Sequence, residues 1–145
     1  MKVMQISPQD TYGIRQQMLR PGLEIDHCKF QNDEDDNTIH LGAFIEGRLV
    51  SVASFYFNNN PRFNEDVQYQ LRGMATLPEH QNQGFSRELL KFGFPLIKRN
   101  FCQLVWCNAR LNAEGFYKKT GFEAIGNTFN IPDIGHHILM IKKFT

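Results

Sequence analysis

The sequence has no long apolar run and almost no net charge. A transmembrane helix requires about 18 or more consecutive apolar residues, and no segment of the 145 residues approaches this length. Residues 1–8 carry no hydrophobic core of a secretion signal. Lys and Arg number 16 against 15 Asp and Glu, a balance that argues against general nucleic-acid binding. We therefore expect a cytoplasmic protein with neither a membrane nor a nucleic-acid partner.

Cysteines and metal-binding patterns are also scarce. The chain has three cysteines and no Cys-x-x-Cys, which fits a reducing compartment. His27-Cys28 has no second pair of ligands at a useful spacing, so Cys28 is expected to be a buried thiol. The acidic run at residues 33–36 lacks the alternating ligands and central glycine of an EF-hand, and it is typical of a solvated loop. The sequence predicts no metal.

Two common nucleotide-binding motifs are absent as well. No Gly-x-x-x-x-Gly-Lys-Ser/Thr occurs, and no Gly-x-Gly-x-x-Gly follows a strand near the start of the chain. What the sequence does contain, at residues 71–90, is an extended stretch, a polar loop and an amphipathic run in succession. The apolar spacing from Phe85 to Ile97 predicts a helix that begins at Gly84.

The start of this predicted helix is suited to a phosphate or a pyrophosphate. The first turn of a helix leaves backbone N–H groups unpaired, and the helix dipole places about half a positive charge there. Gly84 has no Cβ, so a bulky anion can approach the main chain. The spacing Gln81-x-x-Gly84-x-Ser86 is weak by itself, because it also occurs in ordinary loops.

Neighbouring segments make the pattern more specific. Residues 71–79, which contain Gly73-Met74, and residues 113–122, which contain Phe116-Tyr117, resemble two motifs of the GCN5-related N-acetyltransferase (GNAT) superfamily. Residues 15–22 and the hairpin at residues 40–57 resemble the N-terminal half of the same family. The resemblance covers most of the chain, and it depends on the order of the pieces rather than on any one piece.

We expect residues 1–145 to form a single α+β domain. The resemblance implies a GNAT-like fold, with a mixed, mostly antiparallel central sheet that is flanked by helices and has splayed central strands. Pro95 is expected to kink the helix at residues 84–99 or to end it early. Strands are predicted at residues 3–6, 41–45, 49–57, 67–77, 104–107, 122–130 and 137–144, and further helices before Pro21 and at residues 112–119.

The resemblance also implies acetyl-CoA as a co-substrate. Its pyrophosphate is expected on the loop from Gln81 to Arg87, and its pantetheine arm is expected to pair with the strand backbone before that loop. Asn112 is a candidate for a hydrogen bond to pantetheine or for a helix cap. The candidate cofactor-binding residues are Met74, Ala75, Thr76, Gln81, Asn82, Gln83, Gly84, Phe85, Ser86, Arg87 and Asn112.

The sequence departs from the family pattern within this loop. Positions 81 and 83 are commonly basic in the family, whereas both are Gln here. Ser86 stands where Gly or Ala is usual. Arg87 and Lys91, in the first turns of the predicted helix, can restore positive potential. We expect coenzyme binding to survive these replacements.

The resemblance implies that Tyr117 is the catalytic acid that protonates the departing thiolate. No base is assigned. His136 and His137 point in opposite directions if they lie on a strand, so at most one of them faces the site. Arg15 and Arg20 near the end of the first predicted helix either contact the acceptor or are solvated or capping charges, and Arg15 is the candidate for the wall of the acceptor site that the resemblance implies.

The function predicted from the sequence is acetyl transfer from acetyl-CoA to the amine of a small-molecule acceptor, by direct attack in a ternary complex. Three alternatives stay open. They are a weak or inactive coenzyme-binding or sensing domain, an acetyltransferase for a protein or peptide amine, and a nucleotide-binding module. The resemblance is also compatible with a homodimer.

Overall fold

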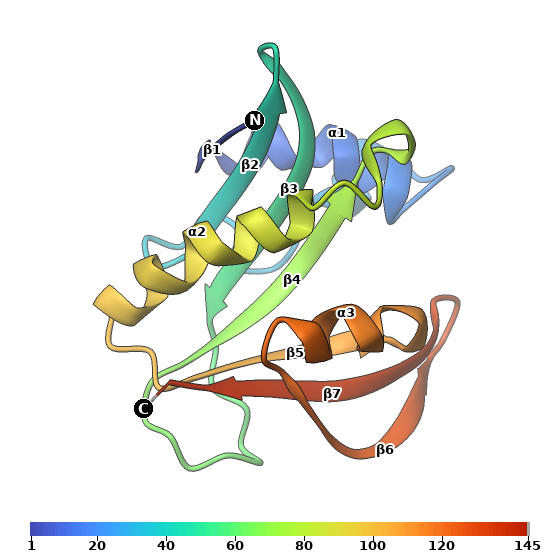
Figure 1. Cartoon of the computed structure of the whole chain (residues 1–145). Coiled ribbons are helices and arrows are strands. Elements are labelled where there is room, and N and C mark those ends of the chain that lie inside the picture. Colours follow the sequence, from blue (N-terminus) through green and yellow to red (C-terminus); the bar gives the residue numbers. More distant parts are fainter. Residues whose placement is uncertain (145) are drawn as a thin grey trace.

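Seven strands form one sheet in the order β1-β2-β3-β4-β5-β7-β6 in the computed structural model, which describes residues 1–144 (Figure 1). Neighbouring strands are antiparallel, except that β4 and β5 are parallel. The α+β class and the mixed, mostly antiparallel sheet predicted from the sequence are thereby confirmed. The strands are β1 (Lys2–Gln5), β2 (Ile39–Ile45), β3 (Arg48–Phe57), β4 (Gln68–Thr76), β5 (Leu104–Arg110), β6 (Glu123–Ile131) and β7 (Gly135–Lys143).

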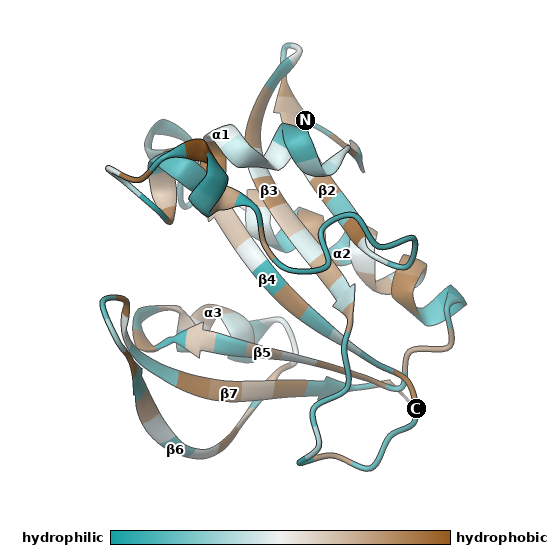
Figure 2. Ribbon diagram, turned by 180° about the vertical axis from the view of Figure 1, so that it is seen from behind, coloured by the Kyte–Doolittle hydropathy of each residue, from teal (hydrophilic) through white to brown (hydrophobic). Residues whose placement is uncertain are grey.

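Helices cover both faces of this sheet. Helix α2 (Phe85–Arg99) lies over one face of β2, β3 and β4, and α1 (Pro8–Met18) lies over the opposite face (Figures 1 and 2). Helix α3 (Glu114–Lys119) lies on the same side as α2 and packs against β5 and β6. Short 3-10 turns occur at η1 (Ile25–Cys28), η2 (Pro78–His80) and η3 (Leu111–Ala113).

The tight turn between β2 and β3 is explained by the backbone conformation of its two residues. Glu46 and Gly47 both have positive φ angles, 49° and 79°. Two successive residues of this kind form a tight turn whose twist matches that of the flanking strands. The predicted hairpin is confirmed, and it makes β3 the central strand of the N-terminal half of the sheet.

Helix α2 is joined to the sheet by close aromatic packing. A Cβ at Gly93 would lie 2.5 Å from the Phe55 ring, so only glycine lets the helix approach β3 this closely. At the next residue, the Phe94 ring lies near those of Phe55, Phe122 and Phe144, with centroid distances of 6.4, 6.2 and 5.5 Å. These contacts join the two halves of the sheet through one core.

Pro95 does not end α2, which continues to Arg99. Of the two effects predicted for this proline, a kink or an early end, the early end is wrong. Proline removes the hydrogen bond to the carbonyl of Lys91. Both residues are exposed, so that carbonyl can bond to water instead. The predicted termination therefore fails because the proline lies on the solvent side of the helix.

The sheet opens at its middle. Strands β4 and β5 pair only where Gln68–Gln70 lie beside Leu104–Trp106. Beyond this point the two strands diverge, as Figure 1 shows. The splayed central strands expected from the sequence are confirmed, and the divergence leaves one edge of β4 free of a partner strand at residues 71–76.

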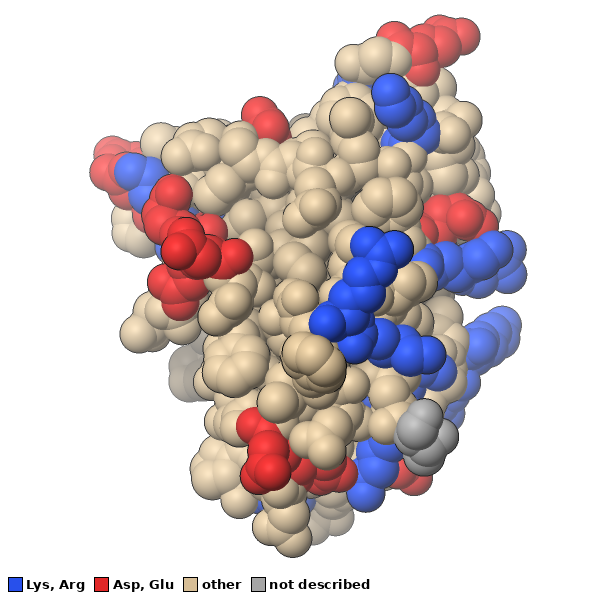
Figure 3. All heavy atoms as spheres, turned by 90° about the vertical axis from the view of Figure 1, so that its left-hand side faces the viewer, with Lys and Arg blue, Asp and Glu red and all other residues tan. Residues whose placement is uncertain are grey.

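Charges are distributed unevenly over the surface without covering it. Figure 3 shows one group of Lys and Arg side chains on the face turned to the viewer, with acidic groups nearer its edges. A basic groove beside α2 is lined by Lys91, Lys98, Arg99, Lys142 and Lys143. Within residues 1–144, no helix is long and apolar enough to cross a membrane.

Candidate active site

Two adjoining cavities lie where β4 and β5 diverge. We call the first the loop cavity, of about 510 Å³, and the second the arginine cavity, of about 250 Å³. The loop cavity is lined by Met18, Leu19, Met74, Ala75, Thr76, Gln81, Asn82, Gly84, Ser86, Arg87, Arg110, Asn112, Ala113, Phe116 and Tyr117. The arginine cavity is lined by Leu19, Arg20, Phe30, Gln70, Leu71, Arg72, Gly73, Met74, Cys107, Asn108, Ala109, Arg110, Ala113, Tyr117, Ile131, Ile134 and His137. They share Leu19, Met74, Arg110, Ala113 and Tyr117, so the two cavities meet at these side chains.

The loop before α2 presents a run of free backbone N–H groups to the loop cavity. Asn82 and Gly84 have positive φ angles of 61° and 88°. Within residues 1–144, the N–H groups of residues 82–87 donate to no other group, and the first helical bond runs from Glu88 N to Gly84 O at 3.1 Å. Consecutive free N–H groups at a helix N-terminus form an anion site. This loop is therefore suited to a phosphate or a pyrophosphate.

The two glutamines of this loop hold its shape. Gln81 Nε2 donates to Thr76 O at 3.2 Å, and Gln83 Nε2 donates to Glu79 O at 3.2 Å. Glu79 is in turn paired with Arg48 on β3 at 3.0 Å. The glutamines that replace the basic residues usual in the family thus bond to backbone carbonyls and leave the N–H groups free.

The free edge of β4 forms the next wall of the loop cavity. Met74, Ala75 and Thr76 line the cavity beside this edge, where no strand pairs with β4. The Thr76 hydroxyl lies 2.7 Å from Ser51 Oγ and 3.5 Å from Ser86 Oγ, so it links β3, β4 and the first turn of α2. An extended ligand that carries amide groups can add to such an edge as a further strand.

Tyr117 stands at the junction of the two cavities. Its side chain is 8% exposed, and its ring packs against Phe116 and Phe122. The hydroxyl donates only to Met74 Sδ at 3.8 Å, a weak acceptor. Burial raises the pKa of Tyr117 above its ordinary value. The phenol therefore stays protonated at neutral pH, with a proton available to a stronger acceptor.

A thiol lies in the same region. Cys107 on β5 lines the arginine cavity, and burial raises its pKa to about 12. The thiolate rather than the thiol is the nucleophile. At neutral pH Cys107 is therefore a poor nucleophile, which favours direct attack by an acceptor over a covalent intermediate on this residue.

Of the two adjacent histidines, His137 faces the site. It is 4% exposed and lines the arginine cavity, whereas His136 is exposed, so the expected opposite orientation is confirmed. His137 Nδ1 lies 2.8 Å from Gly135 O. A carbonyl only accepts, so Nδ1 carries the hydrogen and Nε2 has a free lone pair in the neutral ring. Nε2 is a proton acceptor in a cavity that also contains Tyr117.

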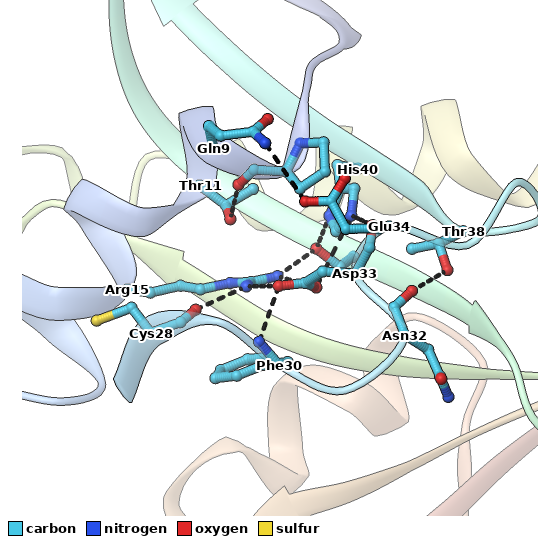
Figure 4. Close-up of polar contacts among 12 residues, drawn as sticks. Gln9, Thr11, Arg15, Cys28, Phe30, Asn32, Asp33, Glu34, Thr38 and His40 are labelled. Atoms are coloured by element: carbon cyan, nitrogen blue, oxygen red, sulfur yellow. Dashed lines mark hydrogen bonds and ion pairs between the residues drawn. The ribbon is translucent and has the colours of Figure 1, made fainter. Parts of the chain in front are cut away.

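A buried polar network supports the loop beside the arginine cavity (Figure 4). Arg15 is fully buried and bonds to both carboxylate oxygens of Asp33, at 2.7 and 3.2 Å, and to the Cys28 carbonyl at 2.9 Å. Asp33 also accepts from the Phe30 backbone N–H at 2.8 Å. This arrangement fixes Phe30 at the wall of the cavity.

The network corrects two expectations. Arg15 is neither a solvated or capping charge nor a residue that lines either cavity, because its guanidinium is enclosed by the network. Asp33, which belongs to a run expected to be solvated, is 5% exposed, whereas residues 34–36 are exposed as expected. A buried ion pair between residues 18 positions apart leaves no local pattern in the sequence. The buried Cys28 thiol agrees with its prediction.

The structure brings most of the candidate cofactor residues together. Gln83 and Phe85 are the exceptions, because Gln83 is exposed away from the cavities and the Phe85 side chain is buried in the core. Their backbone N–H groups still belong to the run of unbonded N–H groups at residues 82–87. The candidates that line the loop cavity are Met74, Ala75, Thr76, Gln81, Asn82, Gly84, Ser86, Arg87, Asn112 and Tyr117.

Sequence reasoning missed Arg72 and Arg110, which line the arginine cavity together with Arg20, whose contact with the acceptor was one of two alternatives left open. Arg72 lies within residues 71–79, one of the two segments that resemble GNAT motifs. A charged residue on a strand rich in apolar residues was the one signal that could have identified it. Within residues 1–144, no group of three or more His, Cys, Asp or Glu side chains is arranged to hold a metal ion.

Comparisons with known proteins agree with this arrangement. The model of the Acetyltransferase (GNAT) family matches residues 5–122. Over 142 residues the chain is 42% identical to the uncharacterized N-acetyltransferase YitI of Bacillus subtilis (strain 168), with 98% of this chain and 95% of that protein covered. The fold is similar to an aminoglycoside 6′-N-acetyltransferase complexed with coenzyme A, with a TM-score of 0.77, 10% identity and coverage of 99% and 97%. It is also similar to a putative N-acetyltransferase from Lactobacillus plantarum, with a TM-score of 0.78, 16% identity and coverage of 99% and 98%.

Proposed function

Because the chain belongs to the acetyltransferase (GNAT) family and is an N-acetyltransferase, we propose that it transfers an acetyl group from acetyl-CoA to the amine of a small molecule. The observation that carries this proposal is the run of free N–H groups at residues 82–87, which opens into a cavity that ends at Tyr117. Such a site provides for a diphosphate at one end and for a reacting thioester at the other.

Acetyl-CoA is proposed to occupy the loop cavity. Its diphosphate accepts from the N–H groups of residues 82–87, and each bond to a charged oxygen contributes about 1.5–3 kcal/mol. Its pantetheine amides pair with the free edge of β4 beside Met74 and Thr76. The thioester then lies at the junction of the two cavities, beside Tyr117.

The acceptor is proposed to enter through the arginine cavity. Its neutral amine attacks the thioester carbon, a C–N bond forms, and the C–S bond breaks. His137 Nε2 takes the proton that the amine nitrogen loses, and the Tyr117 hydroxyl gives a proton to the departing sulfur. The products are an N-acetyl amine and coenzyme A, and the site is restored when His137 releases its proton to solvent and Tyr117 takes one up from solvent.

Two measurements test this function. Coenzyme A release is measured with a thiol reagent over an unbiased amine panel, and turnover of at least one amine is expected. Thermal shifts with acetyl-CoA and with ATP are compared in parallel, and only acetyl-CoA should stabilise the chain. Stabilisation by acetyl-CoA without turnover of any amine would favour a sensing domain, and stabilisation by ATP alone would favour a nucleotide-binding module.

A further inference from the structure

We propose that the acceptor amine carries an anionic group, a carboxylate or a phosphate, that Arg72 binds in the arginine cavity. This inference rests on the proposed function, because it names the class of molecule that the acceptor site takes.

The arginine cavity is lined by charges of one sign. Three arginines face it, Arg20, Arg72 and Arg110, and no Asp or Glu among residues 1–144 lines it. The chain as a whole is nearly neutral, so this imbalance is local. A cavity with several cations and no counter-charge attracts an anion and repels a polycation.

Arg72 is the arginine best placed to bind such an anion. Its guanidinium lies 4.6 Å from the centroid of the Phe30 ring and 5.8 Å from that of Tyr56, so aromatic rings hold it on one side. It makes no ion pair within residues 1–144, whereas Arg15, 4.0 Å from the same Phe30 ring, is fully paired with Asp33. The Asp33 carboxylate is therefore already engaged, and the Arg72 charge lacks a partner of its own.

Burial and the neighbouring arginines both act against the Arg72 charge. Burial is the largest influence on the pKa of Arg72 and lowers it below its ordinary value, and the charges of Arg15 and Arg20 lower it as well. Tyr56 and Asp33 act in the opposite direction but do not outweigh these effects. A partly buried charge is costly without a partner. A bound carboxylate or phosphate would supply that partner and can bond to the guanidinium in a bidentate manner.

The other two arginines flank this position. Arg20 lies 5.5 Å from the Phe30 centroid on the α1 side, and its Nη1 bonds to the Leu19 carbonyl at 3.1 Å. Arg110 is exposed at the junction of the two cavities. They strengthen the positive potential, and Arg72 supplies the fixed contact.

The same potential assists the chemistry. Positive charges near an ammonium group disfavour its protonated form, so they raise the fraction of acceptor that carries a neutral, nucleophilic amine. The arginines repel the ammonium form of the acceptor, and the attraction between the arginines and the anionic group compensates for this repulsion. A cavity of about 250 Å³ suits a molecule the size of an amino acid or a small amino phosphate.

The test compares matched amines that differ in the anionic group. The pairs are L-leucine with L-leucinamide and 6-aminohexanoate with 6-aminohexanamide for the carboxylate, and O-phosphoethanolamine with ethanolamine for the phosphate. Spermidine represents a polycation. The ratio of kcat/KM for the anionic to the neutral member is measured in the natural chain and in Arg72→Gln. Because each ratio is compared between two proteins, differences in amine reactivity within a pair cancel.

We expect the ratio for at least one pair to fall by at least about tenfold in Arg72→Gln, the loss of one charged hydrogen bond. Arg72→Lys keeps the charge but not the bidentate geometry, so its ratio should lie between that of the natural chain and that of Arg72→Gln. Arg99→Gln is the matched control, because it makes the same change in the groove beside α2, and it should leave the ratio unchanged. Which pair responds identifies the anion as carboxylate or phosphate.

Two outcomes separate this inference from the proposed function. The inference would be overturned, and the function left intact, if neutral amines were turned over as fast as their anionic partners. The same holds if Arg72→Gln left the kcat/KM ratio unchanged. If no amine is turned over, the same pairs are titrated calorimetrically into the protein saturated with coenzyme A. Equal binding of anionic and neutral members, or unchanged binding in Arg72→Gln, would then overturn the inference independently.

Discussion

At the scale of single residues, the proposed chemistry depends on two side chains, Tyr117 at the junction of the two cavities and His137 in the arginine cavity. Tyr117 has a buried ring, a raised pKa and only a weak acceptor, Met74 Sδ, for its hydrogen. His137 has one ring nitrogen bonded to a carbonyl and the other unbonded. In the proposed mechanism the tyrosine is the acid and the histidine is the base.

Removing the Tyr117 hydroxyl isolates the acid. Tyr117→Phe should lower kcat at least about tenfold while acetyl-CoA affinity is retained, because the thiolate loses its proton donor. Tyr69→Phe is the matched control, since that hydroxyl bonds to Asn100 and lies outside both cavities. Turnover in Tyr117→Phe equal to that of the control would count against the assignment.

A second substitution isolates the base. In His137→Asn the side-chain amide can still donate to Gly135 O, as Nδ1 does, but nothing replaces Nε2. We expect kcat/KM to fall by about 10²-fold or more. The loss should be smaller at high pH, where more of the acceptor amine is already deprotonated. A pH profile that keeps its shape and height in this variant would exclude His137 as the base.

At the scale of elements, the loop between β4 and α2 is the element that we propose to bind the diphosphate of the coenzyme. Its free N–H groups depend on backbone conformation rather than on basic side chains. The glutamines at positions 81 and 83 are compatible with this role, because they bond to backbone carbonyls of the same segment.

Gly84→Glu tests this element. A Cβ at Gly84 meets nothing within 4 Å, so the new side chain would enter the space proposed for the diphosphate and repel it. We expect acetyl-CoA binding, measured by calorimetry, to be abolished. Gly47→Glu is the control, because it makes the same change at a positive-φ glycine of the β2–β3 turn. Both variants should lose about 1 kcal/mol of stability, and normal acetyl-CoA binding in Gly84→Glu would contradict the role of the loop.

Most elements could be predicted because their signals are local. The Glu46-Gly47 turn, the apolar spacing of α2 and the glycine before it each follow from a few adjacent residues. The effect of Pro95 could not be predicted, because it depends on which side of α2 faces solvent. The grouping of Arg20, Arg72 and Arg110 around one cavity could not be predicted either, because they come from three segments that meet only in the folded chain.

At the scale of the whole molecule, the buried network of Arg15 and Asp33 couples stability to pH, and it includes His40, whose Nε2 lies 2.9 Å from the Asp33 carbonyl oxygen. Burial lowers the pKa of His40. Burial by itself would raise the pKa of Asp33, but hydrogen bonds from Arg15 and Tyr56 outweigh it and lower that pKa. For both groups the unfolded chain binds protons at a higher pH than the folded chain does, so stability is lost as pH falls.

Calorimetric melting at several pH values measures this coupling. The melting temperature should be constant between about pH 7 and pH 8, decline as the pH falls below about 6.5 because of His40, and decline further below about pH 4 because of Asp33. In His40→Gln the first decline should disappear, since no group at position 40 then titrates. An unchanged melting temperature between pH 7 and pH 5 in the natural chain would contradict the assignment.

The ion pair itself is tested by removal of its acid. Asp33→Asn leaves the buried Arg15 charge without its counter-ion and should lower the free energy of unfolding by about 3–5 kcal/mol. Asp35→Asn, two positions along the same loop and exposed, should change it by no more than about 0.5 kcal/mol. Equal stabilities for the two variants would show that the network does not stabilise the fold.

The central claim is that the turn around Gly84 holds a diphosphate and thereby directs a thioester toward Tyr117. A crystal structure of the protein with bound coenzyme A tests it most directly. The account predicts diphosphate oxygens within hydrogen-bonding distance of the N–H groups of residues 82–87 and the coenzyme sulfur beside the Tyr117 hydroxyl. A diphosphate bound elsewhere, or a Tyr117 hydroxyl sealed away from the sulfur, would contradict it.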